Sequence, residues 1–375
     1  MAEPSIHDII YKNFSTVGRD EWQKVARAEI PENISFENLF WNVDGLKFSP
    51  YYIEADFKET EYLKSYHANS NRLLPQTWLN MPEVSVIEED GAYKKSSLFL
   101  QRGADGIVYD FTRFLHSEVN VYNNSVNWDH LTISFKTSDT KVVTDIFACA
   151  EKKITPSKLR GSIWWKQFPK TEHLIQIAGP FLEKYNGYHL FGIEVLPSSA
   201  VKEITAALAQ SVTLIDEMTD LKMDPRTIFR SISLCFTCSE NIIVNIAKLK
   251  SMRMLWYQLS QAFEIPDYLP TDLQIRCRTG QYVSEKFQPH GDMIKNTFQA
   301  LSAIVGGANE ITVIGEDAED SMTDRVALNV SNILKEESHL GKVADPVAGS
   351  YVIEKMVHEF SQAAWIDFQK SNHEA

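Results

Sequence analysis

The sequence predicts an α/β fold, a TIM-type (β/α)8 barrel preceded by an N-terminal extended and helical arm. The first observation behind this prediction is an alternation, from about residue 75 onward, of eight short apolar runs typical of buried strands with helical segments. The second is the stretch from Asp292 to Glu354, which reads as helix, strand and helix with short joints. The third is the aromatic-rich and irregular character of residues 1–74. We therefore expect an arm over 1–74 and a barrel over 75–375.

Composition and charge exclude several classes of protein. The chain of 375 residues is 44% hydrophobic and 23% charged, which is enough for a large core. Its net charge of -13 argues against nucleic acid and against an anionic membrane surface as partners. No apolar run approaches the ~20 residues that cross a bilayer, and the N-terminus lacks the layout of a secretory signal. Four cysteines in so long a chain indicate a reducing compartment without a disulfide framework, so we expect a cytoplasmic protein.

The arm begins with a short predicted helix around Trp22–Ala28 and continues as an irregular segment broken by Pro31, Asp44-Gly45 and Pro50. Large rings follow one another in this segment without a helical or strand period: Phe36, Phe40, Trp41, Phe48, Tyr51 and Tyr52. Such rings need a surface to bury them. The chain's own barrel is one such surface, and another subunit is the alternative.

The predicted barrel consists of strands separated by helices. The strand candidates centre on Trp78–Met81, Ile107–Tyr109, Leu131–Phe135, Gly161–Trp165, His189–Val195, Ile232–Phe236, Leu273–Thr279 and Ile311–Ile314. Predicted helices include Ser138–Glu151, Ser198–Met218, Asn241–Phe263 and a final one over Tyr351–Phe368. Of these, the helix from Asn241 has the clearest apolar stripe, with Ile246, Leu249, Trp256 and Leu259 on one side.

The stretch from Asp292 to Glu354 is the most regular part of the sequence. Its first helix has apolar residues at helical spacing, Ile294, Phe298, Leu301 and Val305, and Gly306-Gly307 end it, because glycine accepts the left-handed conformation of a helix C-cap. The strand over 311–314 and an acidic loop follow. The second helix is expected to turn four apolar side chains inward: Val326, Val330, Ile333 and Leu334.

These motifs resemble the barrel domain of the methylmalonyl-CoA mutase family. The resemblance rests on Ala-Leu-x-Ala-x-x-Gly-Gly at 300–307, on Glu336-Glu337-Ser338, and on Ala-Asp-Pro-x-Ala-Gly-Ser-Tyr at 344–351. It covers nearly the whole chain and is closest after residue 240. In such enzymes an adenosylcobalamin radical reaction interconverts succinyl-CoA and (R)-methylmalonyl-CoA. The resemblance also implies that the aromatic arm grips a partner subunit.

The resemblance places the substrate pocket at the carboxyl ends of the strands. Where family enzymes have Gly-Thr-Ile-Gln-Asn, this chain has Gly161-Ser162-Ile163-Trp164-Trp165, so Ser162 keeps a hydroxyl and Trp164 replaces an amide. If Trp164 points inward, it fills the space of the substrate acyl group. His189 resembles the family's proton-donating histidine, but the register of the next helix puts Gly192 or Glu194 at that position, which favours a structural role for His189.

On the next two strands, the chain lacks further pocket residues of the family enzymes. Ser231 stands where the enzymes have arginine, unless Arg230 substitutes after a register slip, and Ser233 keeps their serine. Arg276 and Arg278 replace a histidine and a glutamine. They lie two residues apart and so on one strand face, which requires an anion: Glu194 or Asp110 across the barrel, or a bound phosphate or carboxylate. We favour the internal ion pair.

Metal binding is not expected. Cys235-x-x-Cys238 points its thiols to opposite faces of a strand, and no second pair of cysteine or histidine residues completes a site. The cobalt-ligating motif Asp-x-His-x-x-Gly of the family's C-terminal cobalamin domain does not occur, so either that domain is absent or the chain is a fragment. The family's radical-shielding tyrosine has no counterpart around Trp78.

The resemblance is therefore closest to the small, non-catalytic subunit of a heterodimeric mutase. No catalytic residue is intact, no cofactor is expected on the chain alone, and adenosylcobalamin is expected in a complex with a large subunit. The isolated chain is expected to be inactive and to self-associate as a homodimer. One alternative is a barrel that is active with a separate cobalamin-binding protein. Another is a barrel repurposed for a phosphorylated or CoA-like ligand at Arg276 and Arg278.

Overall fold

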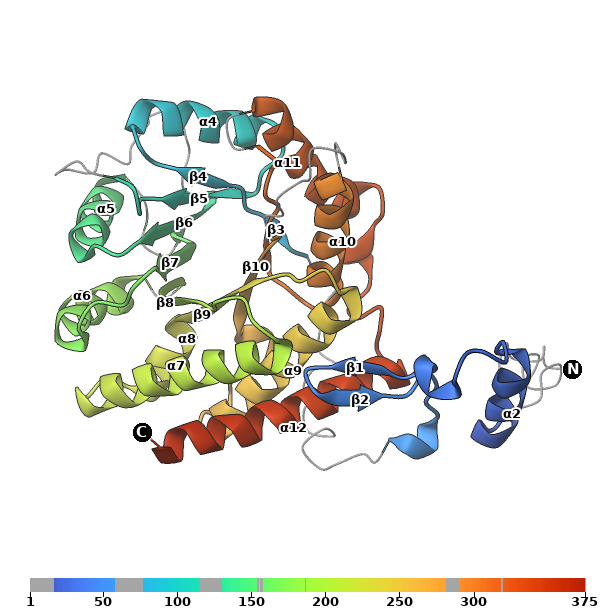
Figure 1. Cartoon of the computed structure of the whole chain (residues 1–375). Coiled ribbons are helices and arrows are strands. Elements are labelled where there is room, and N and C mark those ends of the chain that lie inside the picture. Colours follow the sequence, from blue (N-terminus) through green and yellow to red (C-terminus); the bar gives the residue numbers. More distant parts are fainter. Residues whose placement is uncertain are drawn as a thin grey trace, which may run out of the picture.

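A computed structural model describes residues 17–57, 77–114, 130–153, 155, 158–185, 187–280, 291–317 and 320–374. At its centre is a curled sheet in the order β3-β11-β10-β9-β8-β7-β6-β5-β4, whose ladders are all parallel (Figure 1). The strands are β3 Leu79–Asn80, β4 Glu83–Ser85, β5 Gly106–Asp110, β6 Thr132–Thr137, β7 Gly161–Trp165, β8 Tyr188–Glu194, β9 Ile232–Thr237, β10 Gln274–Arg278 and β11 Glu310–Thr312. The predicted parallel α/β architecture is confirmed.

Helices cover the outer face of the sheet (Figure 1). Those that follow strands are α4 Glu89–Gln101, α5 Thr140–Lys153, α6 Thr171–Lys184, α7 Ala200–Asp220, α9 Ile242–Ala262, α10 Gly291–Val305 and α11 Ser321–Glu336. The short α8, Pro225–Ser231, precedes β9, and the long α12, Tyr351–Glu374, packs across α7 and α9. In the described part of the chain, no helix is long and apolar enough to span a bilayer.

The first predicted strand differs from the expectation. The sequence predicts one strand over Trp78–Met81, but the chain pairs as two short strands, β3 and β4, on either side of Met81-Pro82. Proline has no N–H to donate to a ladder, so it interrupts the strand. The Met81 N–H donates to the Ile311 carbonyl (2.8 Å), and the Pro82 carbonyl accepts from the Val108 N–H (3.0 Å). The sheet is consistent with a TIM-like barrel, although its strand ladders do not close it.

Helix α9 forms over the segment predicted to be helical from Asn241 to Phe263. Asn241 caps it by accepting hydrogen bonds from the N–H groups of Ile243 and Val244. Trp256 is fully buried, and its Nε1 donates to the Tyr268 hydroxyl at 2.9 Å. Because α9 lies between the sheet, α7, α10 and α12, it is buried on nearly all sides rather than on one.

Some apolar residues of α10 and α11 that the sequence places in the core are exposed. Gly307, at φ 90°, ends α10 as expected. However, Ile294 and Phe298 are 59% and 48% exposed, and Ile333 of α11 is exposed to the same degree as Phe298. Instead α10 turns polar side chains toward the strand ends, where Asn296 Nδ2 donates to the Ile314 carbonyl at 2.8 Å. The polar side of α10 faces the carboxyl end of β11, where it satisfies a backbone carbonyl, and part of the apolar stripe faces outward.

The N-terminal arm contains a hairpin that the sequence analysis did not predict. Strands β1 (Trp41–Val43) and β2 (Leu46–Phe48) are joined by Asp44-Gly45, both with positive φ, the conformation of a tight hairpin turn. Phe48 is fully buried and meets Phe360 of α12 edge to face. This part of the arm therefore packs on its own barrel.

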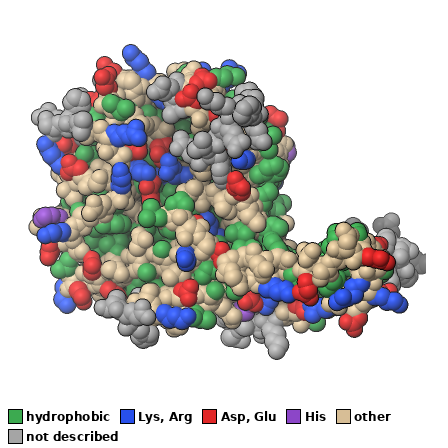
Figure 2. Space-filling model, viewed as in Figure 1, with side chains coloured by type: hydrophobic (Ala, Val, Ile, Leu, Met, Phe, Trp, Pro, Cys, Tyr) green, Lys and Arg blue, Asp and Glu red, His purple; other side chains and the backbone are tan. Residues whose placement is uncertain are grey.

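The remainder of the arm, residues 17–40 and 49–57, is called the outer arm below. Its helix α2, Arg19–Glu29, has no buried residue and projects away from the barrel (Figures 1 and 2). Trp22 stacks on Tyr51 with ring centroids 4.8 Å apart and also contacts Phe36, at 6.1 Å. The outer arm thus holds its rings in a small cluster of its own. Its short 3-10 turns are η1, Phe36–Leu39, and η2, Glu54–Asp56.

Candidate functional site

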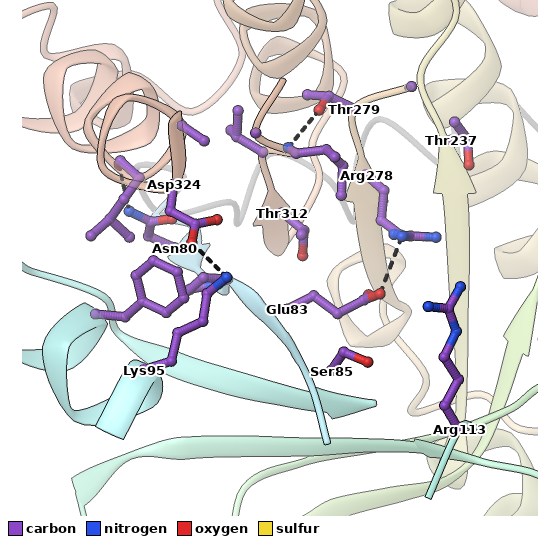
Figure 3. A pocket seen from close by; sticks show the side chains of 18 of the residues that line it. Asn80, Glu83, Ser85, Lys95, Arg113, Thr237, Arg278, Thr279, Thr312 and Asp324 are labelled. Atoms are coloured by element: carbon purple, nitrogen blue, oxygen red, sulfur yellow. Dashed lines mark hydrogen bonds and ion pairs between the residues drawn. The ribbon is translucent and has the colours of Figure 1, made fainter. Parts of the chain in front are cut away.

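A cavity of about 620 Å3 lies at the carboxyl ends of β3, β4, β10 and β11 (Figure 3). This is the end of a parallel α/β sheet at which ligands bind. The strand ends contribute Asn80, Glu83, Ser85, Arg278 and Thr312, and Thr237 ends β9 on the same side. The remaining wall comes from Arg113, which follows β5, from the segments that follow β10 and β11, and from side chains within α4 and α11.

The two arginines of β10 share one carboxylate. Arg276 Nη2 lies 2.7 Å from Glu83 Oε2, and Arg278 Nη2 lies 3.2 Å from Glu83 Oε1. The predicted internal ion pair is confirmed. The predicted carboxylate is wrong, because neither Glu194 nor Asp110 contacts the two arginines. The sequence analysis does not reach Glu83, because the predicted first strand ends at Met81, before Pro82. Glu83 and Arg276 are 193 residues apart in the chain.

Electrostatics keep this trio charged. Burial opposes ionisation of Glu83, yet the nearby charges of Arg276 and Arg278 hold its pKa below the ordinary value. Arg276 is fully buried, and its Nε and Nη2 also donate to Thr312 Oγ1 at 3.2 and 2.9 Å. Thr312 in turn donates to the Met81 carbonyl at 2.6 Å. The trio therefore connects β10, β11 and the split first strand.

A second ion pair lies inside the sheet. The Nζ of Lys136 on β6 lies 2.8 and 2.7 Å from the two carboxylate oxygens of Glu194 on β8. Both oxygens of this predicted pocket residue therefore take part in the ion pair. Glu194 does not line the cavity. It neutralises a lysine that is itself nearly buried.

Trp164 fills the interior of the curled sheet. Its side chain is fully buried and packs with Met81, Val108 and Cys235 in a cluster distinct from the main core. The Arg276 guanidinium carbon lies 5.5 Å from the ring centroid. Glycine at 192 makes room for this ring, since a Cβ there would lie 2.7 Å from Trp164 and 2.3 Å from the Ile163 carbonyl oxygen. Trp164 therefore points inward.

None of the predicted serine positions lines the cavity. Ser162 and Ser233 are fully buried, and their hydroxyls make no hydrogen bond to any described residue. Ser231 ends α8 and donates to the Thr227 carbonyl at 2.7 Å, before β9 begins. Arg230 does not reach the cavity in its place, because it pairs with Asp267 at 3.0 Å.

His189 is placed on β8 beside Ser162, away from the cavity lining. Burial lowers its pKa to about 4, although a hydrogen bond with the Gly161 backbone acts in the opposite sense. At neutral pH its imidazole is therefore uncharged. The arrangement is that of a structural histidine.

The cysteines divide between two environments. Cys235 on β9 belongs to the Trp164 cluster, and Cys238, which follows β9, belongs to the main core, so their thiols lie in different surroundings. Burial raises the pKa of Cys235 to about 12, which keeps it protonated and a poor metal ligand. Across the described ranges, no three His, Cys, Asp or Glu side chains are grouped so as to hold a metal ion.

Of the eight predicted pocket positions, all of them described, Arg278 lines the cavity and seven do not. Sequence reasoning missed Glu83, Arg113, Thr237 and the pair Lys95–Asp324, whose charged atoms are 2.5 Å apart across α4 and α11. Thr237 and Thr312 could have been found, because each is the last residue of a strand. Lys95 and Asp324 carry no such signal, since they lie inside helices.

Comparison with known proteins shows the family of this chain. A family model described as methylmalonyl-CoA mutase matches residues 187–374, half of the chain. The chain belongs to the methylmalonyl-CoA mutase family. The family model covers β8 to α12, which include Arg276 and Arg278. Glu83 and Trp164 lie before the matched residues.

Mutase relatives match the chain over different lengths. It is 25% identical to a methylmalonyl-CoA mutase small subunit of Porphyromonas gingivalis, over 95% of this chain and 63% of that protein. It is 31% identical to a methylmalonyl-CoA mutase small subunit of Streptomyces virginiae, over 54% and 33%. It is 22% identical to a methylmalonyl-CoA mutase of Rhizobium meliloti, over 92% and 56%. The chain spans less than two thirds of the length of each of these mutases.

Solved structures add little to this. A dihydropteroate synthase of Yersinia pestis matches 80% of this chain and 98% of its own at 13% identity, with a TM-score of 0.39. A TM-score this low supports no conclusion about the site.

Proposed function

We propose that this chain is the small, non-catalytic subunit of an adenosylcobalamin-dependent methylmalonyl-CoA mutase, and that a large subunit interconverts succinyl-CoA and (R)-methylmalonyl-CoA. The observation that carries the proposal is the position of Trp164. Its indole is fully buried inside the sheet, at the strand position where the family resemblance implies a substrate-binding glutamine. An indole has one donor and no acceptor. The Glu83–Arg276 pair beside it occupies further interior space.

The cofactor belongs, in this proposal, to the complex rather than to this chain. The described residues that line the cavity include no histidine to ligate cobalt. His189, the one histidine on a strand that the resemblance singled out, lies away from that lining. These observations support a cofactor held by the complex, and we assign this chain no step that involves adenosylcobalamin.

The partner in this proposal is a mutase large subunit. Two relatives named as small subunits support it, at 25% and 31% identity. The outer arm supports it as well, since the rings of Trp22, Phe36 and Tyr51 are only partly buried on a helix and turn that project from the barrel. Without its partner, the chain is expected to self-associate through the same surface. The four cysteines, all free thiols, support a cytoplasmic location.

The barrel architecture forms part of the same proposal. We infer that 79–85 acts as one interrupted strand, because it bonds to β11 through Met81 and to β5 through Pro82. Counted in this way, the strands number eight, in the manner of a TIM-type (β/α)8 barrel.

The test measures activity with and without the partner. The purified chain is titrated with adenosylcobalamin, followed by absorbance, and then assayed for isomerisation of succinyl-CoA. We expect no spectral change and no turnover by the chain alone, and turnover when a mutase large subunit is added. Turnover by the chain alone near ordinary enzyme rates of ~1–1000 per second would contradict the proposal.

A second candidate is a barrel that is active with a separate cobalamin-binding protein. It is favoured by a relative named 2-hydroxyisobutanoyl-CoA mutase large subunit, from Aquincola tertiaricarbonis, at 26% identity over 50% of this chain and 35% of that protein. Turnover by this chain together with a cobalamin-binding protein, in the absence of any other mutase barrel, would favour this candidate over the first.

A further inference from the structure

We propose that the cavity binds a small organic anion, with its anionic group between Arg278 and Arg113 and its apolar body between α4 and α11. The volume of about 620 Å3 falls within the ordinary range for small-molecule sites. The two ends of the cavity differ in character.

The charged end carries an excess of guanidinium. Glu83 is the carboxylate for both Arg276 and Arg278, so one negative charge is shared by two positive ones. The Nε of Arg278 is buried and makes no hydrogen bond to any described residue. A donor left in that condition costs free energy until an acceptor reaches it.

Arg113 adds a second guanidinium at this end. It is exposed, and in Figure 3 its side chain is directed toward that of Arg278 from the opposite wall. Two guanidiniums that face one another repel, and an anion between them removes the repulsion. Because the whole chain carries a net charge of -13, this local positive field runs against the charge of the molecule.

The other end of the cavity is neutral and largely apolar. Lys95 and Asp324 neutralise one another across it, at 2.5 Å (Figure 3). Phe99 follows Lys95 by one helical turn on α4, and Ala327 and Leu328 follow Asp324 on α11, so these apolar side chains line the same end. An aliphatic or aromatic body would be buried there. The site therefore suits a carboxylate or phosphomonoester with an apolar body.

Titration calorimetry on the whole chain, at low ionic strength, tests this. The probes are acetate, butanoate, hexanoate, hexanamide, hexyl phosphate and inorganic phosphate. We expect hexanoate or hexyl phosphate to bind in a 1:1 complex, and affinity to rise from acetate to hexanoate by up to about fourfold per methylene. The neutral hexanamide should bind at least about tenfold more weakly than hexanoate. The tighter of hexanoate and hexyl phosphate identifies the head group.

Variants locate the site. Arg113→Gln should weaken binding of the tighter probe about tenfold or more, because it removes one charge-assisted contact. Its folding is not at risk, since Arg113 is exposed. The matched control, Arg102→Gln, removes the same charge from an exposed residue outside the cavity and should leave affinity unchanged.

Three results would overturn the proposal. The first is no binding of hexanoate or hexyl phosphate up to about 10 mM. The second is inorganic phosphate binding as tightly as hexyl phosphate, since the apolar end would then be unused. The third is unchanged affinity in Arg113→Gln. None of these results bears on subunit assembly or turnover, so the proposed function is tested separately.

Discussion

At the scale of the residue, Trp164 determines how the interior of the sheet is filled. A single indole occupies the interior of the sheet, and the absence of a side chain at Gly192 is what lets it do so. The buried guanidinium of Arg276 lies over its face and is held in turn by Glu83. These contacts make the interior of the sheet packed and charged at this point.

Glu83→Gln should destabilise the protein by about 3–5 kcal/mol at pH 7, because it leaves Arg276 buried without its carboxylate. Urea unfolding of the variant beside the unmodified chain measures this. The pKa of Glu83 is lowered by folding, so its contribution is present above its ordinary pKa of 4.5 and is lost as pH falls through the lower folded value. The loss of stability in Glu83→Gln should therefore diminish in acid. A loss under about 1 kcal/mol at pH 7 would show that Arg276 finds another acceptor.

His189 should make the stability of the protein depend on pH between 6.5 and about 4. Folding lowers its pKa from 6.5 to about 4, so the unfolded chain binds the proton first, and stability falls as pH falls through this window. The loss should reach up to about 3 kcal/mol. Unfolding free energies of the unmodified chain and of His189→Asn, measured from pH 7 to pH 4, isolate this contribution, because all other histidines cancel in the difference. Parallel curves for the two proteins would refute it.

At the scale of elements, the hairpin β1–β2 joins the arm to the barrel. Its turn, Asp44-Gly45, lies at the start of α7, where the Val201 N–H donates to Asp44 Oδ2 at 2.9 Å. The first N–H groups of a helix have no partner within the helix, so this carboxylate caps α7 from a distant part of the sequence. The same turn that shapes the hairpin thus fixes its position.

Asp44→Ala should lower the unfolding free energy by about 1–2 kcal/mol, through loss of this cap. The positive φ of 54° at this residue adds to the cost, since alanine disfavours it. Asp44→Asn is the control, because asparagine keeps an acceptor oxygen and tolerates positive φ. Urea unfolding of the three proteins gives the comparison. Equal losses in the two variants would mean that the charge, rather than the hydrogen bond or the backbone, matters.

At the scale of the whole molecule, the arm has two parts with different surroundings. The hairpin packs on α12 through Phe48, whereas α2 has no buried residue and projects from the barrel (Figure 1). A subunit contact through the outer arm is therefore separable from the stability of the barrel.

The double variant Trp22→Ala with Phe36→Ala should lose co-purification with a mutase large subunit, while its unfolding midpoint in urea changes little. Phe48→Ala is the matched control. It removes a fully buried ring and should cost about 3–5 kcal/mol of stability, yet retain co-purification. Undiminished co-purification of the double variant would show that the outer arm is not the contact.

The sequence by itself determined the features that depend on neighbouring residues. Periodicity predicted the alternation of strands and helices, glycine predicted the end of α10 at Gly307, and the spacing of Arg276 and Arg278 predicted an internal counter-ion. The tertiary structure alone decided which carboxylate pairs with the two arginines, because Glu83 lies on a strand 193 residues from Arg276 in the chain. It also decided that Phe298 faces outward, since the polar side of α10 satisfies a backbone carbonyl beyond the carboxyl end of β11. Periodicity reports which side of an element is apolar, but contacts between distant strands and helices decide what each side meets.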